Sequence, residues 1–245
     1  MNTTTEEVHG IVGIFDALGA KNFGSAQVSS YIRSQELVLK AVDDKASGQS
    51  ASRNLAKPKI FTFNDTIIIA LDTEAYNEYN AIKGFAKIVR RFISYSLSKS
   101  LFFRGAFSIG SYIASDEHNL IMGNAVTDAA SWYEQVELIG AVATPKASMI
   151  IHQHALQDSK PPDFLLFEAD IPCKQGSRKL YAVNWPKAFY VRGLRPPKCE
   201  KGQELACLLR LLVTNEVPFG TELKYKHTVD FFTNAPNQET DNDNT

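Results

Sequence analysis

Apolar residues recur along the chain with two different periods, one typical of helices and one typical of strands. The clearest helical pattern covers residues 73–99, where large apolar side chains return every three or four positions. The clearest strand pattern covers residues 8–15, a nearly continuous apolar run of the kind found in central strands. The same criteria predict further strands at 59–63, 66–71, 102–114, 119–122, 141–144, 163–169 and 178–185, and further helices at 25–47, 123–138 and 145–156.

The order of these elements predicts the fold class. Strand hairpins mixed with helices favour an α+β fold, with a mixed central sheet and helices packed on it, over a doubly wound nucleotide-binding fold. After residue 195 the pattern becomes helical, with helices predicted at 199–214 and 218–233. The predicted organisation is a disordered N-terminus (1–7), a main domain (8–190), a C-terminal helical extension (195–233) and a disordered, polar tail (234–245).

Composition and charge exclude several classes of partner. The chain has 245 residues, 44% of them hydrophobic, which is enough for one sizeable core. Its net charge of −1 provides no basic field that would attract a nucleic-acid duplex or an anionic membrane. No apolar run approaches the roughly 18 residues of a membrane span, and the polar, acidic start does not resemble a signal peptide.

The cysteines bear on the cellular compartment. There are three, Cys173, Cys199 and Cys207. The odd count and wide spacing argue against a disulfide framework and against a zinc site. A reducing cytoplasm is therefore the expected location.

Two aspartates carry the candidate chemistry. Asp16 ends the apolar run that starts at residue 8, and Asp65 follows the run that starts at residue 59. A carboxylate at the tip of a buried strand is costly unless it is paired or binds a metal. Two of them on neighbouring strands can hold a pair of divalent cations, an arrangement common in phosphoryl transfer. The simpler alternatives are a helix N-cap for Asp16 and an ordinary Asn-Asp turn for Asp65.

Four segments resemble motifs of the class III nucleotidyl cyclases, and they follow one another in that family's order. They are Phe15-Asp16-Ala17-Leu18-Gly19, Phe63-Asn64-Asp65, the stretch Arg104 to Gly110 with alanine in place of the middle glycine, and Gly123-Asn124-Ala125-Val126. Within the family, the chain most resembles the compact pyrimidine cyclases of the bacterial Pycsar anti-phage systems. The resemblance implies the class III cyclase fold for the main domain.

The resemblance also implies an activity. A cyclase of this kind converts UTP or CTP to a 3′,5′-cyclic monophosphate, as a homodimer with active sites at the interface and with a separate effector protein. Asp16 and Asp65 would hold two divalent cations, Mn²⁺ or Mg²⁺. The backbone of Ala17, Leu18 and Gly19 would surround the triphosphate.

Two positions bear on the base that such a site would accept. Phe61 occupies the place where purine cyclases carry a lysine or glutamate, and the partner position falls near Leu120 or Ile121. These apolar side chains cannot hydrogen-bond a purine edge. The pattern favours a pyrimidine, or no nucleotide at all, and simple core packing is the alternative for Phe61.

A further departure concerns transition-state stabilisation. The family's asparagine and arginine fall on Thr127 and Ser131, or on Asp128 and Trp132 if the alignment shifts by one. Losing a charged stabiliser costs several kcal/mol in the barrier. Arg104 and Lys146 are the candidate replacements, although a solvated surface charge is the simpler interpretation of each. The second hypothesis is therefore a catalytically silent cyclase-fold module that binds a nucleotide or a protein.

Overall fold

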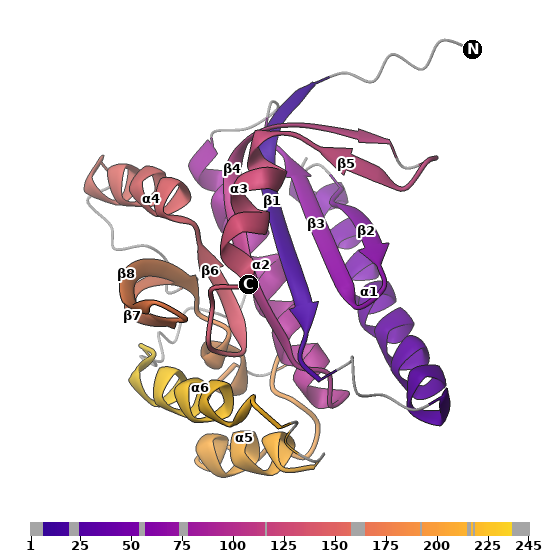
Figure 1. Ribbon diagram of the computed structural model, residues 1–245, viewed down its shortest axis with the longest axis vertical. Helices are drawn as coiled ribbons and strands as arrows, with labels where there is room; N and C mark the ends of the chain where they lie inside the picture. Colours follow the sequence, from indigo (N-terminus) through magenta and orange to yellow (C-terminus); the bar gives the residue numbers. More distant parts are fainter. Residues whose placement is uncertain are drawn as a thin grey trace.

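A mixed sheet of eight strands organises the chain (Figure 1). The computed structural model describes residues 7–19, 25–53, 57–73, 78–115, 117–157, 165–191, 193–214, 217 and 219–236. In spatial order the strands are β2 (Lys59–Phe63), β3 (Thr66–Asp72), β1 (Val8–Ala17), β4 (Phe103–Ser115), β6 (Gly140–Ala143), β8 (Gly176–Val183) and β7 (Leu166–Cys173), and β5 (Leu120–Met122) pairs with the end of β4. The α+β fold class predicted from the sequence is confirmed.

Helices cover both faces of the sheet. Helix α2 (Glu78–Ser98) lies behind the sheet in Figure 1 and α3 (Asn124–Tyr133) lies in front of it. Helix α1 (Ser25–Arg53) packs on α2, and α4 (Pro145–Gln157) follows β6. The short 3₁₀ helix η2 (Pro186–Phe189) leads to the last two helices, α5 (Glu204–Leu212) and α6 (Glu222–Asn234), which lie side by side. No helix in the described part of the chain has the length and apolar character needed to cross a bilayer.

The buried side chains form two clusters, one for each face of the central strands. The larger one contains the apolar face of α2, with Phe85, Val89 and Phe92, and extends to α5 and α6. The smaller one lies under α3 and includes Val12 and Phe61. Strand β1 contributes to both clusters, because successive side chains of a strand point to opposite faces. Its almost complete burial agrees with the prediction of a central strand.

Most predicted elements are present, and the differences have physical reasons. The helix predicted to reach residue 138 ends at Tyr133, and Val136 instead forms a bridge to Cys173. The strand predicted at 163–169 lies at Leu166–Cys173. Pro172 is tolerated there because β7 is an edge strand. The helix predicted at 25–47 is longer than expected, since α1 continues to Arg53.

The C-terminal helices share the core of the main sheet. Trp185 is fully buried, and its ring lies 6.2 Å from that of Phe231 and 5.8 Å from that of Phe232, measured between centroids. Both phenylalanines belong to α6. The division into a domain at 8–190 and an extension at 195–233 stays a prediction. The disorder predicted for 1–7 and 234–245 concerns mainly residues 1–6 and 237–245, which lie outside the described residues.

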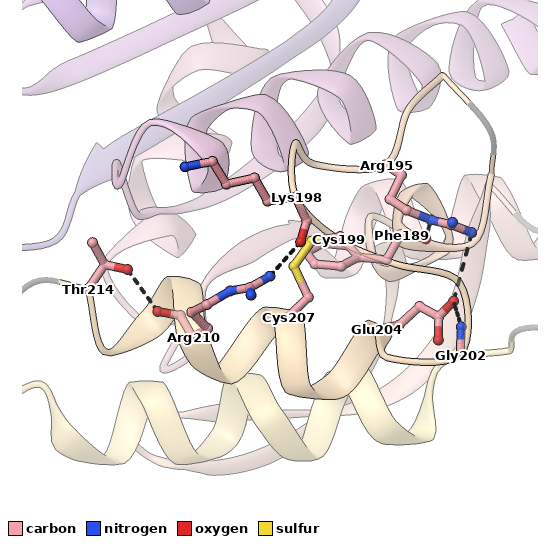
Figure 2. Close-up of a disulfide and its surroundings, with 9 residues drawn as sticks. All are labelled: Phe189, Arg195, Lys198, Cys199, Gly202, Glu204, Cys207, Arg210 and Thr214. Carbon is pink, nitrogen blue, oxygen red and sulfur yellow. Dashed lines mark hydrogen bonds and ion pairs between the residues drawn. A yellow bond between two sulfur atoms is a disulfide. The ribbon is translucent and has the colours of Figure 1, made fainter.

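The cysteine count and spacing argued against a disulfide framework, yet one pair of cysteines is bonded. Cys199 and Cys207 are bonded, with their Cα atoms 5.5 Å apart, within the range of natural disulfides. Figure 2 shows the bond between the segment before α5 and the helix itself, beside the hydrogen bond that Arg210 donates to the carbonyl of Lys198 (2.6 Å). Helix α5 begins only at Glu204, so the intervening turn brings the two cysteines together. The third cysteine, Cys173, is free.

Reduction of this disulfide is expected to destabilise the protein. The bond closes a loop of eight residues in sequence separation, for which loop-closure entropy gives about 2–3 kcal/mol. Urea unfolding should show this loss for Cys199→Ser, or for the unchanged protein with a reductant. Cys173→Ser is the matched control and should keep its sensitivity to reductant. A Cys199→Ser protein that is as stable as the oxidised parent would contradict the prediction.

Glu78, at the start of α2, is expected to make the unfolding free energy fall at acidic pH. It pairs with His154 of α4 (3.0 Å) and His9 of β1 (3.3 Å). Burial alone would raise the pKa of Glu78, but the hydrogen bonds from His154 and His9 outweigh it and lower the pKa. A lowered pKa stabilises the fold above the usual glutamate value of about 4.3, and this contribution disappears as the pH falls through the lowered pKa.

The measurement is urea unfolding of the parent and of Glu78→Gln between pH 7 and pH 2.5. The difference in unfolding free energy should shrink towards zero as the pH falls from about 5 to 2.5. A difference that grows over this acid range would have the wrong sign and would exclude this account of Glu78.

Candidate active site

The two candidate aspartates lie at the same end of adjacent antiparallel strands. Asp16 is opposite Thr66 in the register of β1 with β3, one residue from Asp65. The N–H of Ala17 donates to the carbonyl of Asp65 (3.1 Å), so the two backbones touch at this point. Asp65 lies in the two-residue turn between β2 and β3, where Asn64 has a φ of +54°, the conformation that favours asparagine in tight hairpins.

Both carboxylates also act on one neighbouring side chain. Burial raises the pKa of the Tyr31 hydroxyl on α1, and the charges of Asp65 and Asp16 raise it further. One hydroxyl is thus within electrostatic reach of both carboxylates. The N-cap alternative for Asp16 does not fit, since this residue lies within β1 and α1 begins only at Ser25. The turn alternative for Asp65 does fit, and a turn position does not prevent its side chain from binding a cation.

Arg104 lies directly across from Asp16 on β4. Its Nε and Nη2 both donate to Asp16 Oδ2, at 3.2 and 3.1 Å, and its Nη1 donates to the carbonyl of Glu134 at 3.1 Å. The side chains of Arg104 and Asp16 are only 13% and 16% exposed. Arg104 is therefore a paired and largely buried cation at the candidate site, and the surface-charge alternative does not apply to it.

The predicted phosphate loop is partly used for other contacts. The N–H of Ala17 donates to Asp65, and the N–H of Leu18 donates to the carbonyl of Phe102 (2.8 Å). In this structure both N–H groups are hydrogen-bonded within the chain, and their contact with a triphosphate stays a prediction. Gly19 follows with a φ of +83°, and its contact with phosphate stays a prediction.

The two base-reading candidates come from neighbouring segments. Phe61 is buried in the cluster under α3, together with Ile121. Leu120 is 44% exposed at the start of β5. Asn119, next to it, donates to the carbonyl of Thr62 (3.1 Å), which holds the β4–β5 turn beside β2. In a single chain Phe61 is a buried core residue, as the packing alternative predicts. Its contact with a base stays a prediction.

Lys146 does not join the two aspartates within one chain. Its Nζ lies over Gly110, 3.2 Å from where a Cβ of that residue would be. Gly110 and Arg104 are on the same strand, β4, six positions apart, or roughly 20 Å at about 3.4 Å per residue. A role for Lys146 at this site would require a second chain.

Helix α3 presents different residues to the sheet and to the outside. Asp128 faces inwards and accepts hydrogen bonds from the hydroxyls of Ser108 (2.5 Å) and Thr144 (2.7 Å). Thr127 and Ser131 are exposed. In the first alignment the two positions therefore point away from this chain's own sheet, whereas in the shifted alignment Asp128 points towards it.

Sequence patterns did not identify Tyr31, Glu137 or Lys224 near this site. Glu137 and Lys224 continue the charge pairing of Arg104, with Glu137 Oε1 at 4.0 Å from Arg104 Nη1 and Glu137 Oε2 at 3.0 Å from Lys224 Nζ. Their separation in sequence leaves no spacing signal. Among the described residues, no group of three or more His, Cys, Asp or Glu side chains is placed to hold a metal ion. A cation at Asp16 and Asp65 would need further oxygen ligands from substrate and water.

No protein-family model matches the sequence, and no curated protein matches it. Among solved structures, the catalytic core of a rhodopsin-guanylyl cyclase with converted specificity, in complex with ATPalphaS, is similar over 74% of this chain and 98% of its own, at 12% identity and a TM-score of 0.48. The guanylyl cyclase Cya2 is similar over 73% of this chain and 92% of its own, at 10% identity and a TM-score of 0.39.

A third similar structure is a class III adenylyl cyclase-like ATP-binding protein from Pseudomonas aeruginosa. It matches 59% of this chain and 35% of its own length, at 13% identity and a TM-score of 0.38. The TM-scores of these three structures are all below 0.5.

Proposed function

We propose that this protein is a nucleotidyl cyclase that converts UTP or CTP to the 3′,5′-cyclic monophosphate and pyrophosphate. The observation that carries the proposal is the convergence of Asp16 and Asp65 at the ends of two adjacent strands, with Arg104 in contact with Asp16. Two carboxylates and one guanidinium at one spot suit a substrate that arrives as a polyphosphate with divalent cations.

The donor set fits two Mn²⁺ or Mg²⁺ ions. Carboxylate oxygens are the ligands these hard cations prefer, and the phosphates and water complete the coordination. When bound, such cations lower the pKa of the ribose 3′-hydroxyl and neutralise charge on the leaving pyrophosphate. The role of Asp16 and Asp65 is to hold them in place. Arg104 is proposed to supply the cationic stabilisation of the family's absent arginine, by turning part of its guanidinium from Asp16 to a phosphate oxygen.

The proposed base is a pyrimidine because Phe61 and Leu120 have no side-chain groups that could read a purine edge. Backbone groups would then discriminate between uracil and cytosine. This part of the proposal rests on the resemblance of the motifs.

The proposed active form is a homodimer with its sites at the interface. The exposed Thr127 and Ser131 of α3 would face the other chain, and Lys146 would act from there. Exposed apolar side chains around the β4–β5 hairpin support an interface at this place, namely Phe63 (41%), Leu120 (44%) and Met122 (54%). The cyclic nucleotide would act on a separate effector in antiviral defence. The proposed location is the cytoplasm, where reducing conditions would hold Cys199 and Cys207 as thiols.

The test is incubation of the purified protein with Mn²⁺ and each of the four ribonucleoside triphosphates in turn, with products identified by mass. A cyclic pyrimidine nucleotide supports the whole proposal. A cyclic purine nucleotide would support the reaction and reject the base assignment.

The second candidate is a silent binding module, which one observation favours. Arg104 donates two hydrogen bonds to Asp16 Oδ2, so the guanidinium already neutralises the carboxylate that a cation would need. Absence of any cyclic product, together with Mn²⁺ binding that does not depend on Asp16, would favour this module over the cyclase.

A further inference from the structure

Four charged side chains of alternating sign form a continuous row from β1 to α6. Asp16 accepts two hydrogen bonds from Arg104 at 3.1 and 3.2 Å, and Arg104 Nη1 lies 4.0 Å from Glu137 Oε1. Glu137 Oε2 lies 3.0 Å from Lys224 Nζ. The row starts at the candidate active site and ends on the C-terminal helix α6, which Figure 1 shows below β7 and β8.

The row is largely shielded from water. The side chains of Asp16, Arg104, Glu137 and Lys224 are between 12% and 17% exposed. Charged groups at such burial are expensive to desolvate, so a row of them contributes little to stability compared with apolar packing of the same volume. Charges interact more strongly away from solvent. Removing one charge of the row therefore changes the pairing of the charged side chain next to it.

Hydrogen bonds to the backbone fix the position of Lys224 relative to Glu137. His227 Nδ1 donates to the Glu137 carbonyl (2.9 Å), and the Ile139 N–H donates to Thr228 Oγ1 (2.8 Å). Thr228 is fully buried. The loop after α3 and the helix α6 are therefore held together independently of the charges, and loss of one charge should leave this junction in place.

We propose that Glu137 and Lys224 are positioning residues that set how strongly Arg104 pairs with Asp16, and through this the affinity of Asp16 for a divalent cation. Arg104 is shared between two carboxylates, Asp16 and Glu137. Glu137 pairs closely with Lys224 and only at 4.0 Å with Arg104. Arg104 can therefore pair mainly with Asp16. The inference rests on the proposed function in one respect, namely that Asp16 binds the cation.

The geometry predicts opposite effects on cation affinity when Lys224 or Glu137 loses its charge. In Lys224→Met, Glu137 is released to Arg104, Arg104 moves from Asp16, and the cation binds more tightly. In Glu137→Gln, Arg104 has only Asp16 as a carboxylate partner, and the cation binds more weakly. In the double variant, Lys224 has no charge left to act on, so its effect should vanish and the affinity should equal that of Glu137→Gln.

The experiment is calorimetric titration of the full chain with Mn²⁺ in the absence of nucleotide. We expect a shift of roughly tenfold in each direction, at the low end of what outer partners of metal ligands produce. Lys226→Met, on the exposed side of the same helix, is the matched control and should leave the affinity unchanged. A double variant whose affinity returns to that of the parent would show plain additive charge effects and would overturn the inference, as would equal shifts in Lys224→Met and Lys226→Met.

A second readout separates this inference from the proposed function. The ¹⁵N resonance of the Arg104 Nε–H reports on its pairing with Asp16 and needs no metal. It should move in Lys224→Met and stay in place in Lys226→Met. If Asp16→Asn leaves Mn²⁺ binding unchanged, the proposed function fails, and the resonance then decides alone whether Lys224 controls Arg104. An unmoved resonance in Lys224→Met overturns the inference whatever the metal does.

Discussion

Replacing Asp65 with asparagine is expected to reduce cyclic nucleotide formation by about 10³-fold, a barrier increase of about 4 kcal/mol. Asparagine keeps the size of the side chain and suits the hairpin turn in which Asp65 lies. The change therefore removes the negative charge that would hold a cation and leaves the local structure intact. The measurement is the initial rate with Mn²⁺ and the best triphosphate, together with the melting temperature of the variant.

The matched control is Asp72→Asn, which makes the same chemical change at the opposite end of the same strand, β3. It should keep nearly full activity. Equal losses in both variants would mean that activity follows the general charge or stability of β3, and an active Asp65→Asn protein would remove Asp65 from the proposed cation site.

Asp16→Asn should differ from Asp65→Asn in its effect on stability. Both should be inactive, but Asp16 is also the carboxylate partner of the largely buried Arg104. Asparagine keeps an oxygen that can accept from Arg104 but carries no charge, and weakening the pairing of a largely buried guanidinium costs about 1–3 kcal/mol. A lower unfolding free energy for Asp16→Asn than for Asp65→Asn is therefore expected in urea.

The central part of the fold could be predicted from local sequence signals. The helical period over 73–99 predicts α2, and the Asn64-Asp65 turn predicts the β2–β3 hairpin, because these signals lie within one element. Glycine at position 123, with a φ of +135°, begins α3 where the motif placed it. Edge strand β7 was misplaced because Pro172 is a strand breaker in general and is tolerated only at an edge.

The candidate site was predictable only where it depends on strand ends. Asp16 and Asp65 each end or follow an apolar run, so the sequence alone indicated both. The pairing of Arg104 with Asp16 depends on the register of β4 against β1, and the contact of Glu137 with Lys224 depends on where α6 docks. The hydrogen bonds of the Ala17 and Leu18 N–H groups could not be predicted from the motif, because they depend on where the backbones of Asp65 and Phe102 lie.

Replacing Phe232 with alanine is expected to cause the largest loss of stability, about 3–5 kcal/mol. Its ring is 1% exposed and its centroid lies 5.1 Å from that of Phe189, 5.8 Å from that of Trp185 and 6.2 Å from that of Tyr190. Truncation would leave a cavity among these rings, which belong to the segment that joins the sheet to the C-terminal helices. For a chain of this size the melting temperature should fall by roughly 6–20 °C.

Phe219→Ala is the matched control, since it removes the same side chain from a position that is 95% exposed. It should leave the melting temperature nearly unchanged. The comparison also decides how the chain is divided. If Phe232→Ala gives one cooperative transition at lower temperature, residues 195–233 belong to the same folding unit as the sheet. If it gives a second, separate transition and leaves the main one in place, the C-terminal helices form a unit of their own, as the predicted division into 8–190 and 195–233 implies.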